Sequence, residues 1–436
     1  MMKVYNISVY YGGLASLFLL ASTANSFELT ANLYVSADYS NNVSLDSTST
    51  DDDITQTLGL NVLLKETRKR FNADASFNLE EEHYYNNTFS NQTSLTTGFG
   101  IFNFDIIEKF LDWRTSFTRT EVLKNSSDSD TPDNREQRNI FRTGPSINYR
   151  ISRESALSAS TNYTLVENSD EEASDTKRLN SKLSYNYALN SITTLSLSSQ
   201  YDEILDGDGS EELKKTNFNL GIRRILPLGE LNFNYGRTQT HSDGSDSVEG
   251  NFFDINFSRK QLLWHDLSLQ YLQDISDTSI GFEGDEQNAE TPNEPNINSE
   301  EGVTRLDVIT RKRLNLTASR VFGGYQYAVT GFWEYETYKE LNNDERSRGM
   351  SLSLGHNVSQ YLSVGAEYTF SLNDFVDQPL IGKDKTSTYL LNSQYNLSEN
   401  LNLSAHVQYA AKSNSHNQAR EYEEFSTAMS INWKLL

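Results

Sequence analysis

Cysteine is absent from the 436 residues of this chain, and proline occurs only six times. The lack of cysteine excludes disulfides, thiolate metal sites and a lipid anchor on an N-terminal cysteine. Mean hydropathy is −0.61, and outside the first 26 residues no apolar run is long enough for a membrane helix. A membrane form of this chain would therefore have to cross the bilayer in strands.

Positive charge is also scarce, because 37 lysines and arginines stand against 60 acidic residues and give a formal net charge of −23. Binding to nucleic acid depends on basic residues that neutralise phosphates, so this balance argues against a nucleic-acid partner.

The first 26 residues have the layout of a secretory signal peptide. Lys3 precedes the apolar run Gly13–Ala21, and small residues follow at positions 24–26. The apolar run is too short to span a bilayer, although a retained anchor is the alternative. We expect cleavage near Ser26, which leaves residues 27–436 as the mature chain.

From Leu29 to Leu436 the chain alternates apolar and polar residues in bursts of roughly ten residues. In the last burst, Phe425–Leu435, apolar or small side chains take the odd numbers, and Ser, Ala, Asn or Lys the even ones. Such strands have one apolar and one polar face. The pattern predicts an all-β fold, a transmembrane antiparallel up-and-down β-barrel.

Long acidic connections alternate with short ones along this domain. The ten long ones are 40–53, 81–92, 124–135, 167–177, 205–215, 241–250, 276–302, 339–347, 373–385 and 412–422, and the nine short ones are 65–70, 105–109, 152–155, 190–192, 227–229, 260–262, 322–324, 359–360 and 398–399. They predict about 20 strands (range 18–20), with short turns in the periplasm and long loops outside. Because strands start at Leu29, we expect no plug domain.

Two strands depart from the regular pattern. The run Thr304–Ala318 keeps one parity after the longest loop, which predicts a tall hairpin that rises above the membrane. Gly144–Pro145 interrupts another strand, where proline removes a hydrogen-bond donor and predicts a bend or bulge.

Aromatic residues are abundant, with 24 tyrosines and four tryptophans. Many lie near predicted strand ends, as in the aromatic girdles of membrane barrels. The alternative is an aromatic surface that binds sugars, for which Tyr34 and Trp264 are the inward-facing candidates.

Charged residues lie on the polar faces of several strands. By parity the candidate lumen-lining residues are Arg114, Arg138, Arg142, Arg223, Arg305, Arg311 and Arg313, with Asp74, Asp112 and Asp307. They could select among solutes, or they could simply pair across strands. The arginines at 305, 311 and 313 need acidic partners, which an anionic polymer or the loop Ser276–Gly302 could supply. That loop is also the expected constriction of a wide lumen.

The acidic clusters of the loops are solvated surface, or they bridge through divalent cations to the phosphates of lipopolysaccharide. Asp206–Glu211 resembles the start of a calcium loop, but it lacks the glycine at the sixth position and the distal glutamate. The six histidines show no ligand spacing, and no glycine-rich phosphate loop occurs. We therefore expect no metal, no cofactor and no enzymatic activity.

The segment Arg142–Arg150, followed by Leu157–Ser160, resembles a repeated segment of outer-membrane β-barrels that are associated with exosortase/PEP-CTERM exopolysaccharide gene clusters. The layout is similar over the whole barrel, whereas the motif is short. The resemblance implies export or surface handling of an exopolysaccharide, with periplasmic export components as partners, and it implies no catalytic residue. The chain departs from barrels that end on an aromatic residue, because Trp433 lies three residues before its last residue.

The sequence therefore predicts an aqueous conduit in a Gram-negative outer membrane, in contact with lipid and lipopolysaccharide and linked to exopolysaccharide export. A general or anion-preferring porin is the first alternative. A structural or adhesion barrel with a blocked lumen is the second.

Overall fold

The structure is a computed structural model that describes residues 27–48, 50–124, 128–169, 175–207, 209, 212–242, 247–262, 265–277, 307–339, 344–376 and 382–435. The expected signal peptide, Trp264 and Arg305 lie outside these residues.

Twenty strands make up nearly all of the described chain. Their bounds are β1 Phe27–Ser40, β2 Asp53–Arg68, β3 Phe71–Tyr84, β4 Gln92–Ile107, β5 Leu111–Leu123, β6 Arg135–Arg150, β7 Ser155–Asn168, β8 Thr176–Asn190, β9 Thr193–Asp206, β10 Glu212–Leu226, β11 Gly229–Ser242, β12 Val248–Leu262, β13 His265–Asp277, β14 Val308–Phe322, β15 Tyr325–Tyr338, β16 Glu345–Asn357, β17 Leu362–Phe375, β18 Lys383–Ser398, β19 Leu401–Asn414 and β20 Tyr422–Lys434. Short 3₁₀ turns occur at η1 Pro132–Asn134 and η3 Gln418–Arg420. No helix in these parts is long and apolar enough to cross a membrane.

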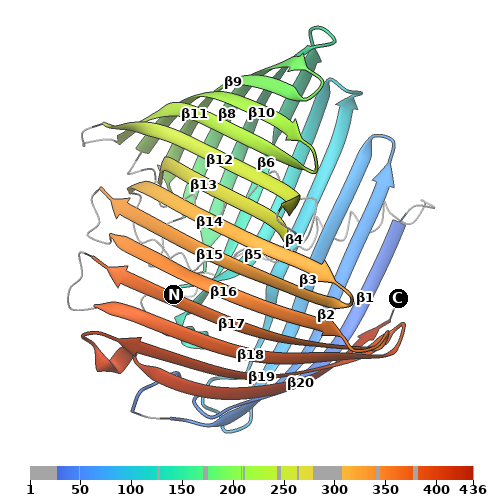
Figure 1. Cartoon of the computed structure of the whole chain (residues 1–436), viewed down its shortest axis with the longest axis vertical. Coiled ribbons are helices and arrows are strands. Elements are labelled where there is room, and N and C mark those ends of the chain that lie inside the picture. Colours follow the sequence, from blue (N-terminus) through green and yellow to red (C-terminus); the bar gives the residue numbers. More distant parts are fainter. Residues whose placement is uncertain are drawn as a thin grey trace, which may run out of the picture.

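The sheet closes on itself. Each strand pairs antiparallel with the next strand in the chain, as Figure 1 shows. Residues 32–40 of β1 pair with residues 426–434 of β20 and close the ring. The predicted all-β barrel of about twenty antiparallel strands is therefore confirmed.

The two faces of the wall follow from the strand register, because directly paired residues project to the same side. One row of paired residues is apolar and runs through Leu197, Leu220, Tyr235 and Phe253, whereas the neighbouring row runs through Ser198, Asn219 and Gly236. Arg178 of β8 lies on the polar face and is 3.9 Å from Asp277 of β13. Strands this far apart can meet only across the interior, so the polar face lines the lumen.

Connections are short at one end of the barrel and long at the other, as predicted. The turn between β14 and β15 shows why the short ones can be tight. Gly323 and Gly324 have φ angles of 56° and 83°, which the two central residues of a type I′ hairpin turn require and which glycine adopts without strain.

The two expected irregularities had different outcomes. β6 keeps its pairing to β5 through Gly144–Pro145, but its pairing to β7 is interrupted between Thr143 and Ser146, so the predicted irregularity is present. The predicted tall hairpin falls partly outside the described residues, which do not include 278–306. The described part of β14 begins at Val308 and has 15 residues, against 13 in β13 and 14 in β15, and the outer ends of β13 and β14 turn into the lumen.

Candidate constriction in the lumen

The wall splits between β12 and β13 near the outer end of the barrel. Their pairing ends at Phe253 and Gln273, although β12 remains paired to β11 as far as Val248. β13 and β14 remain paired to each other as far as Asp277 and Val308. Residues 274–277 of β13 are therefore free of β12, whereas residues 308–310 of β14 stay paired to β13 and, through Ile309 and Tyr338, to β15. We call residues 274–277 and 308–310 the inserted tip.

The inserted tip packs against the inner face of the wall. Ile275 and Val308 form a buried cluster with Ile204 of β9 and Leu213 of β10, at exposures of 0–4%. The Cγ1 atom of Ile275 lies only 3.2 Å from where a Cβ would stand on Gly250 of β12. The absence of a side chain at Gly250 thus makes room for the tip, and the apolar contact favours the inserted position.

Buried charges join the tip to the inner face of the wall at β8–β10. Asp277 approaches Arg178, whose Nε donates to Asp202 Oδ1 of β9 at 3.1 Å. Lys215 of β10 is close enough to interact electrostatically with Asp202 and with Asp274 of the tip. Removing one partner from a buried ion pair is costly, because it leaves an uncompensated charge. This network therefore fixes where the tip is seated.

The interface between tip and wall is incompletely hydrogen-bonded. The hydroxyl groups of Thr238, Thr240 and Ser276 are buried, and each lacks a hydrogen-bond partner among the described residues. A buried unsatisfied polar group costs about 1–3 kcal/mol. These groups offset part of the packing energy of the tip.

An ion-pair ladder continues below the tip on the lumen side of β14 and β15. Arg311 Nε lies 2.5 Å from Glu336 Oε1 and 3.7 Å from Glu334 Oε1, and Arg313 Nη2 lies 2.6 Å from Glu334 Oε1. The register places both arginines on the lumen face, and glutamates from β15 provide the acidic partners that the sequence required.

The other predicted lumen residues are spread around the wall. Arg138 is buried, with Glu136 at 3.6 Å and with Asn168, which accepts a hydrogen bond from its Nε at 2.6 Å. Arg142 donates to Thr164 at 3.2 Å. Arg223 forms a two-pronged pair with Glu230 at 2.7 and 2.9 Å, close to the short turn between β10 and β11.

Four predicted positions remain. Arg114 is exposed on the lumen face, where it pairs with Gly144 of β6. Asp307 is buried and accepts a hydrogen bond from the Val308 amide at 2.6 Å. Asp74 lies opposite Lys65, and Asp112 accepts a hydrogen bond from Asn148 at 3.4 Å. Only Asp307, Arg311 and Arg313 adjoin the tip, so the structure does not gather the predicted residues into one site.

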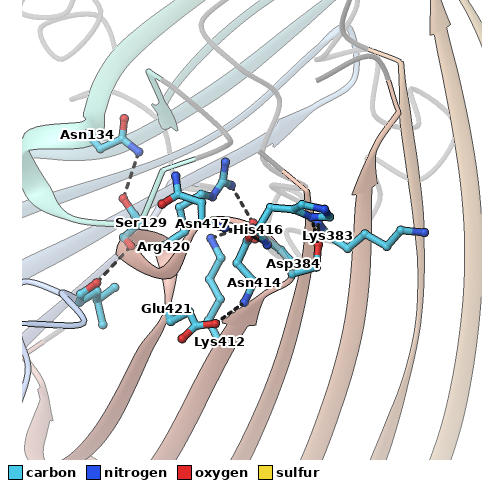
Figure 2. Close-up of polar contacts among 12 residues, drawn as sticks. Ser129, Asn134, Lys383, Asp384, Lys412, Asn414, His416, Asn417, Arg420 and Glu421 are labelled. Carbon is cyan, nitrogen blue, oxygen red and sulfur yellow. Dashed lines mark hydrogen bonds and ion pairs between the residues drawn. The ribbon is translucent and has the colours of Figure 1, made fainter. Parts of the chain in front are cut away.

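A second group of contacts covers another part of the outer mouth (Figure 2). Asp384 of β18 lies 3.0 Å from Lys412 Nζ and 2.7 Å from Arg420 Nη2, and it accepts a hydrogen bond from Asn414 at 2.5 Å. Arg420 belongs to η3, so this contact ties the connection between β19 and β20 to the inner wall. Ser129, between β5 and β6, donates to the Leu45 carbonyl between β1 and β2 at 3.3 Å.

Sequence reasoning missed the residues that seat the tip, namely Arg178, Asp202, Lys215, Asp274 and Asp277. Four of them, all except Asp277, share the parity of the polar strand faces, and this parity was the signal that could have identified them. No group of three or more potential ligands for a metal ion occurs among the residues the structure describes.

No protein-family model and no curated protein match this chain. Among solved structures, a variant of the ferric enterobactin receptor PfeA from Pseudomonas aeruginosa matches with a TM-score of 0.50 and 12% identity, covering 94% of this chain and 80% of that chain. Another PfeA variant, in complex with enterobactin, has the same TM-score at 11% identity, covering 94% and 81%. The FrpB iron transporter from Neisseria meningitidis (F3-3 variant) matches at 0.49 and 8%, covering 96% and 83%. The likeness to PfeA shows the fold alone, that of an outer-membrane β-barrel.

Proposed function

We propose that this chain is an outer-membrane conduit for a polar solute, and that the inserted tip narrows its lumen and moves to let the solute pass. The observation that carries the proposal is the reach of Asp277 from β13 to Arg178 on β8, across the interior of the barrel. The tip is separated from β12 but stays joined to β15, and it folds onto the inner face of β8–β10, so it occupies part of the lumen and reduces the free passage.

An exopolysaccharide is the proposed cargo. The resemblance of Arg142–Arg150 to barrels linked with exopolysaccharide export supports this assignment. The lumen face also carries rows of serine, such as Ser158, Ser184 and Ser198, whose hydroxyl groups can exchange hydrogen bonds with those of a sugar chain.

A structural barrel that stays closed is the second candidate. It is favoured by the complete burial of Asp202 and Asp277 and by the contacts between loops at the mouth. The two candidates differ in whether the tip moves, so one experiment separates them.

The test uses a disulfide that locks the tip to the wall. In Gly250→Cys/Ile275→Cys the sulfur of residue 275 would lie near the 3.2 Å position of Ile275 Cγ1, which suits a disulfide. The chain has no cysteine of its own, so no other disulfide can form. A matched control, Ser184→Cys/Ser198→Cys, joins two wall strands that are already paired.

In planar bilayers we expect the oxidised lock to abolish opening events and reduction to restore them, while the control pair conducts alike in both states. A large steady conductance in the oxidised lock would mean that the tip does not close the path, which contradicts the proposal and favours a porin. Silence of the wild type and of the reduced lock would indicate the closed structural barrel. Loss of surface exopolysaccharide from cells that lack the protein, restored by the wild type, tests the cargo separately.

A further inference from the structure

The outward face of β14–β18 carries a concentration of positive charge just above the apolar band. Two neighbouring rows of paired residues contain it: Lys312, Tyr335, Arg346, Asp374 and Lys383 in the first, and Leu314, Trp333, Arg348, Leu372 and Lys385 in the second. Five cations and one carboxylate thus share this surface. We call the five cations, Lys312, Arg346, Arg348, Lys383 and Lys385, the basic patch.

The position of the basic patch places it at the boundary of the membrane. Both rows lie toward the end with the long connections, which is the outer end of such barrels. The next rows toward the short turns are apolar or aromatic at Met350, Phe370, Leu352, Tyr368 and Tyr389, with only small residues between. The patch is therefore at the depth of outer-leaflet headgroups.

Aromatic rings hold two of the cations against the wall. The Arg346 guanidinium lies 5.2 Å from the centre of the Tyr335 ring, and Lys385 Nζ lies 5.7 Å from the centre of the Phe370 ring. Such contacts stabilise a cation at the surface and reduce the entropy it would lose on binding a ligand. The patch is thus partly organised before any ligand arrives.

The charge balance differs from that of other outward cations at this end. Arg237 pairs with Glu249, Lys214 lies 2.7 Å from Glu212, and Arg135 lies 2.7 Å from Asp130. In the basic patch Asp374 is 2.9 Å from Lys383 and is the only acid in the two rows. On a chain with a net charge of −23, this excess of positive charge is a local exception.

We propose that the basic patch binds the phosphorylated headgroup of an outer-leaflet glycolipid, with its acyl chains lying along the apolar rows below. Arginine and lysine bind phosphate oxygens through charge-assisted hydrogen bonds, and arginine can do so with two donors at once. The aromatic rings next to the patch suit a ligand with a charged headgroup at the level of the cations and apolar chains at the level of the apolar rows. This direct contact to phosphate is a different mode of binding from the bridging by acidic loops and divalent cations considered from the sequence.

For the test, the full chain is reconstituted in phosphatidylcholine vesicles that contain bisphosphorylated lipid A and is then extracted with detergent. Mass spectrometry measures the amount of lipid A that stays bound to the protein. Arg346→Gln/Arg348→Gln/Lys383→Gln/Lys385→Gln should lower retention by about fivefold for each charge removed. The control Lys214→Gln/Arg237→Gln removes outward cations that have acidic partners, and it should retain lipid like the wild type. The exposed positions in the patch let the variant fold, which circular dichroism checks.

A second variant gives the opposite prediction. Asp374→Asn removes the carboxylate that competes for Lys383, so its retention of lipid A should rise several-fold. Excess inorganic phosphate should not displace the lipid. Displacement would indicate a site for free phosphate and would contradict the proposal. Equal retention by the four-residue variant and the wild type, equal retention of lipid A without phosphates, or no gain in Asp374→Asn would overturn the proposal.

Discussion

Single glycines decide where large side chains can lie on this wall. Tyr34 of β1 faces the lumen, as predicted, and lies across Gly59 of β2, where its hydroxyl group hydrogen-bonds to Glu80 of β3. A Cβ on Gly59 would stand only 2.0 Å from Cζ of that ring. The contact spans three strands, so the glycine serves the packing of its neighbours.

Gly59→Ala should therefore destabilise the barrel by about 1–3 kcal/mol, the usual cost of overpacking a filled site. The measurement is the free energy of unfolding in denaturant. Gly331→Ala is the matched control, because the nearest atom to its new Cβ is the Gly349 carbonyl oxygen at 4.0 Å. That control should be neutral or slightly stabilising, since alanine loses less backbone entropy than glycine. Equal losses in both variants would contradict the role of the Tyr34 contact.

At the scale of elements, the alternation of side chains predicted most strands, because it follows directly from the two faces of a strand. It failed at the end of β13. Ile275 and Asp277 have the parity of the outward residues Leu269 and Tyr271, so alternation assigns them to lipid. After the split from β12, the same face of the ribbon meets the inner wall. That split depends on long-range packing at Gly250, which periodicity in a single strand does not contain.

The partners of the predicted arginines show a similar limit. Parity identified Arg311 and Arg313 as lumen-facing candidates, and the register places them on that face. Glu334 and Glu336 were not recognised as their partners, because this depends on the register between two strands. The network of Arg178, Asp202 and Asp277 joins three strands and was still harder to predict.

The ion-pair ladder of β14 and β15 gives a prediction at this scale. Arg311→Ala leaves the largely buried Glu336 without its cation, and it should cost about 3–5 kcal/mol in the free energy of unfolding. Arg311→Ala/Glu336→Ala removes both charges and should cost less than the two single losses combined, so a double-mutant cycle with Arg311→Ala and Glu336→Ala should report a coupling between the two positions. Additive losses would show that the pair contributes nothing.

The same ladder bears on ion selectivity. Because glutamates neutralise Arg311 and Arg313, replacing both arginines with alanine exposes negative charge along the lumen. If the path passes this wall, its preference should shift toward cations, which reversal potentials across a salt gradient would measure. Unchanged selectivity would mean that the path lies elsewhere.

For the whole molecule, closure is the property on which every lumen argument depends. A closed barrel satisfies all backbone groups of its strands and leaves no edge exposed to lipid. Here closure depends on the pairing of β1 with β20, whose register extends over residues 32–40 and is among the shortest in the wall.

A disulfide across this seam tests closure directly. Ala37 and Met429 are paired and face outward, so Ala37→Cys/Met429→Cys should oxidise readily in the folded protein. The bond should raise the free energy of unfolding by roughly 5 kcal/mol, because it closes a very long loop in the unfolded chain. In the control Ala37→Cys/Met350→Cys, the second cysteine lies on β16, about 24 Å around the wall at ~4.8 Å per strand. It should not oxidise, because disulfides need Cα atoms within about 7 Å. An open sheet would place β1 and β20 at opposite edges, and the seam disulfide would then form no faster than in the control.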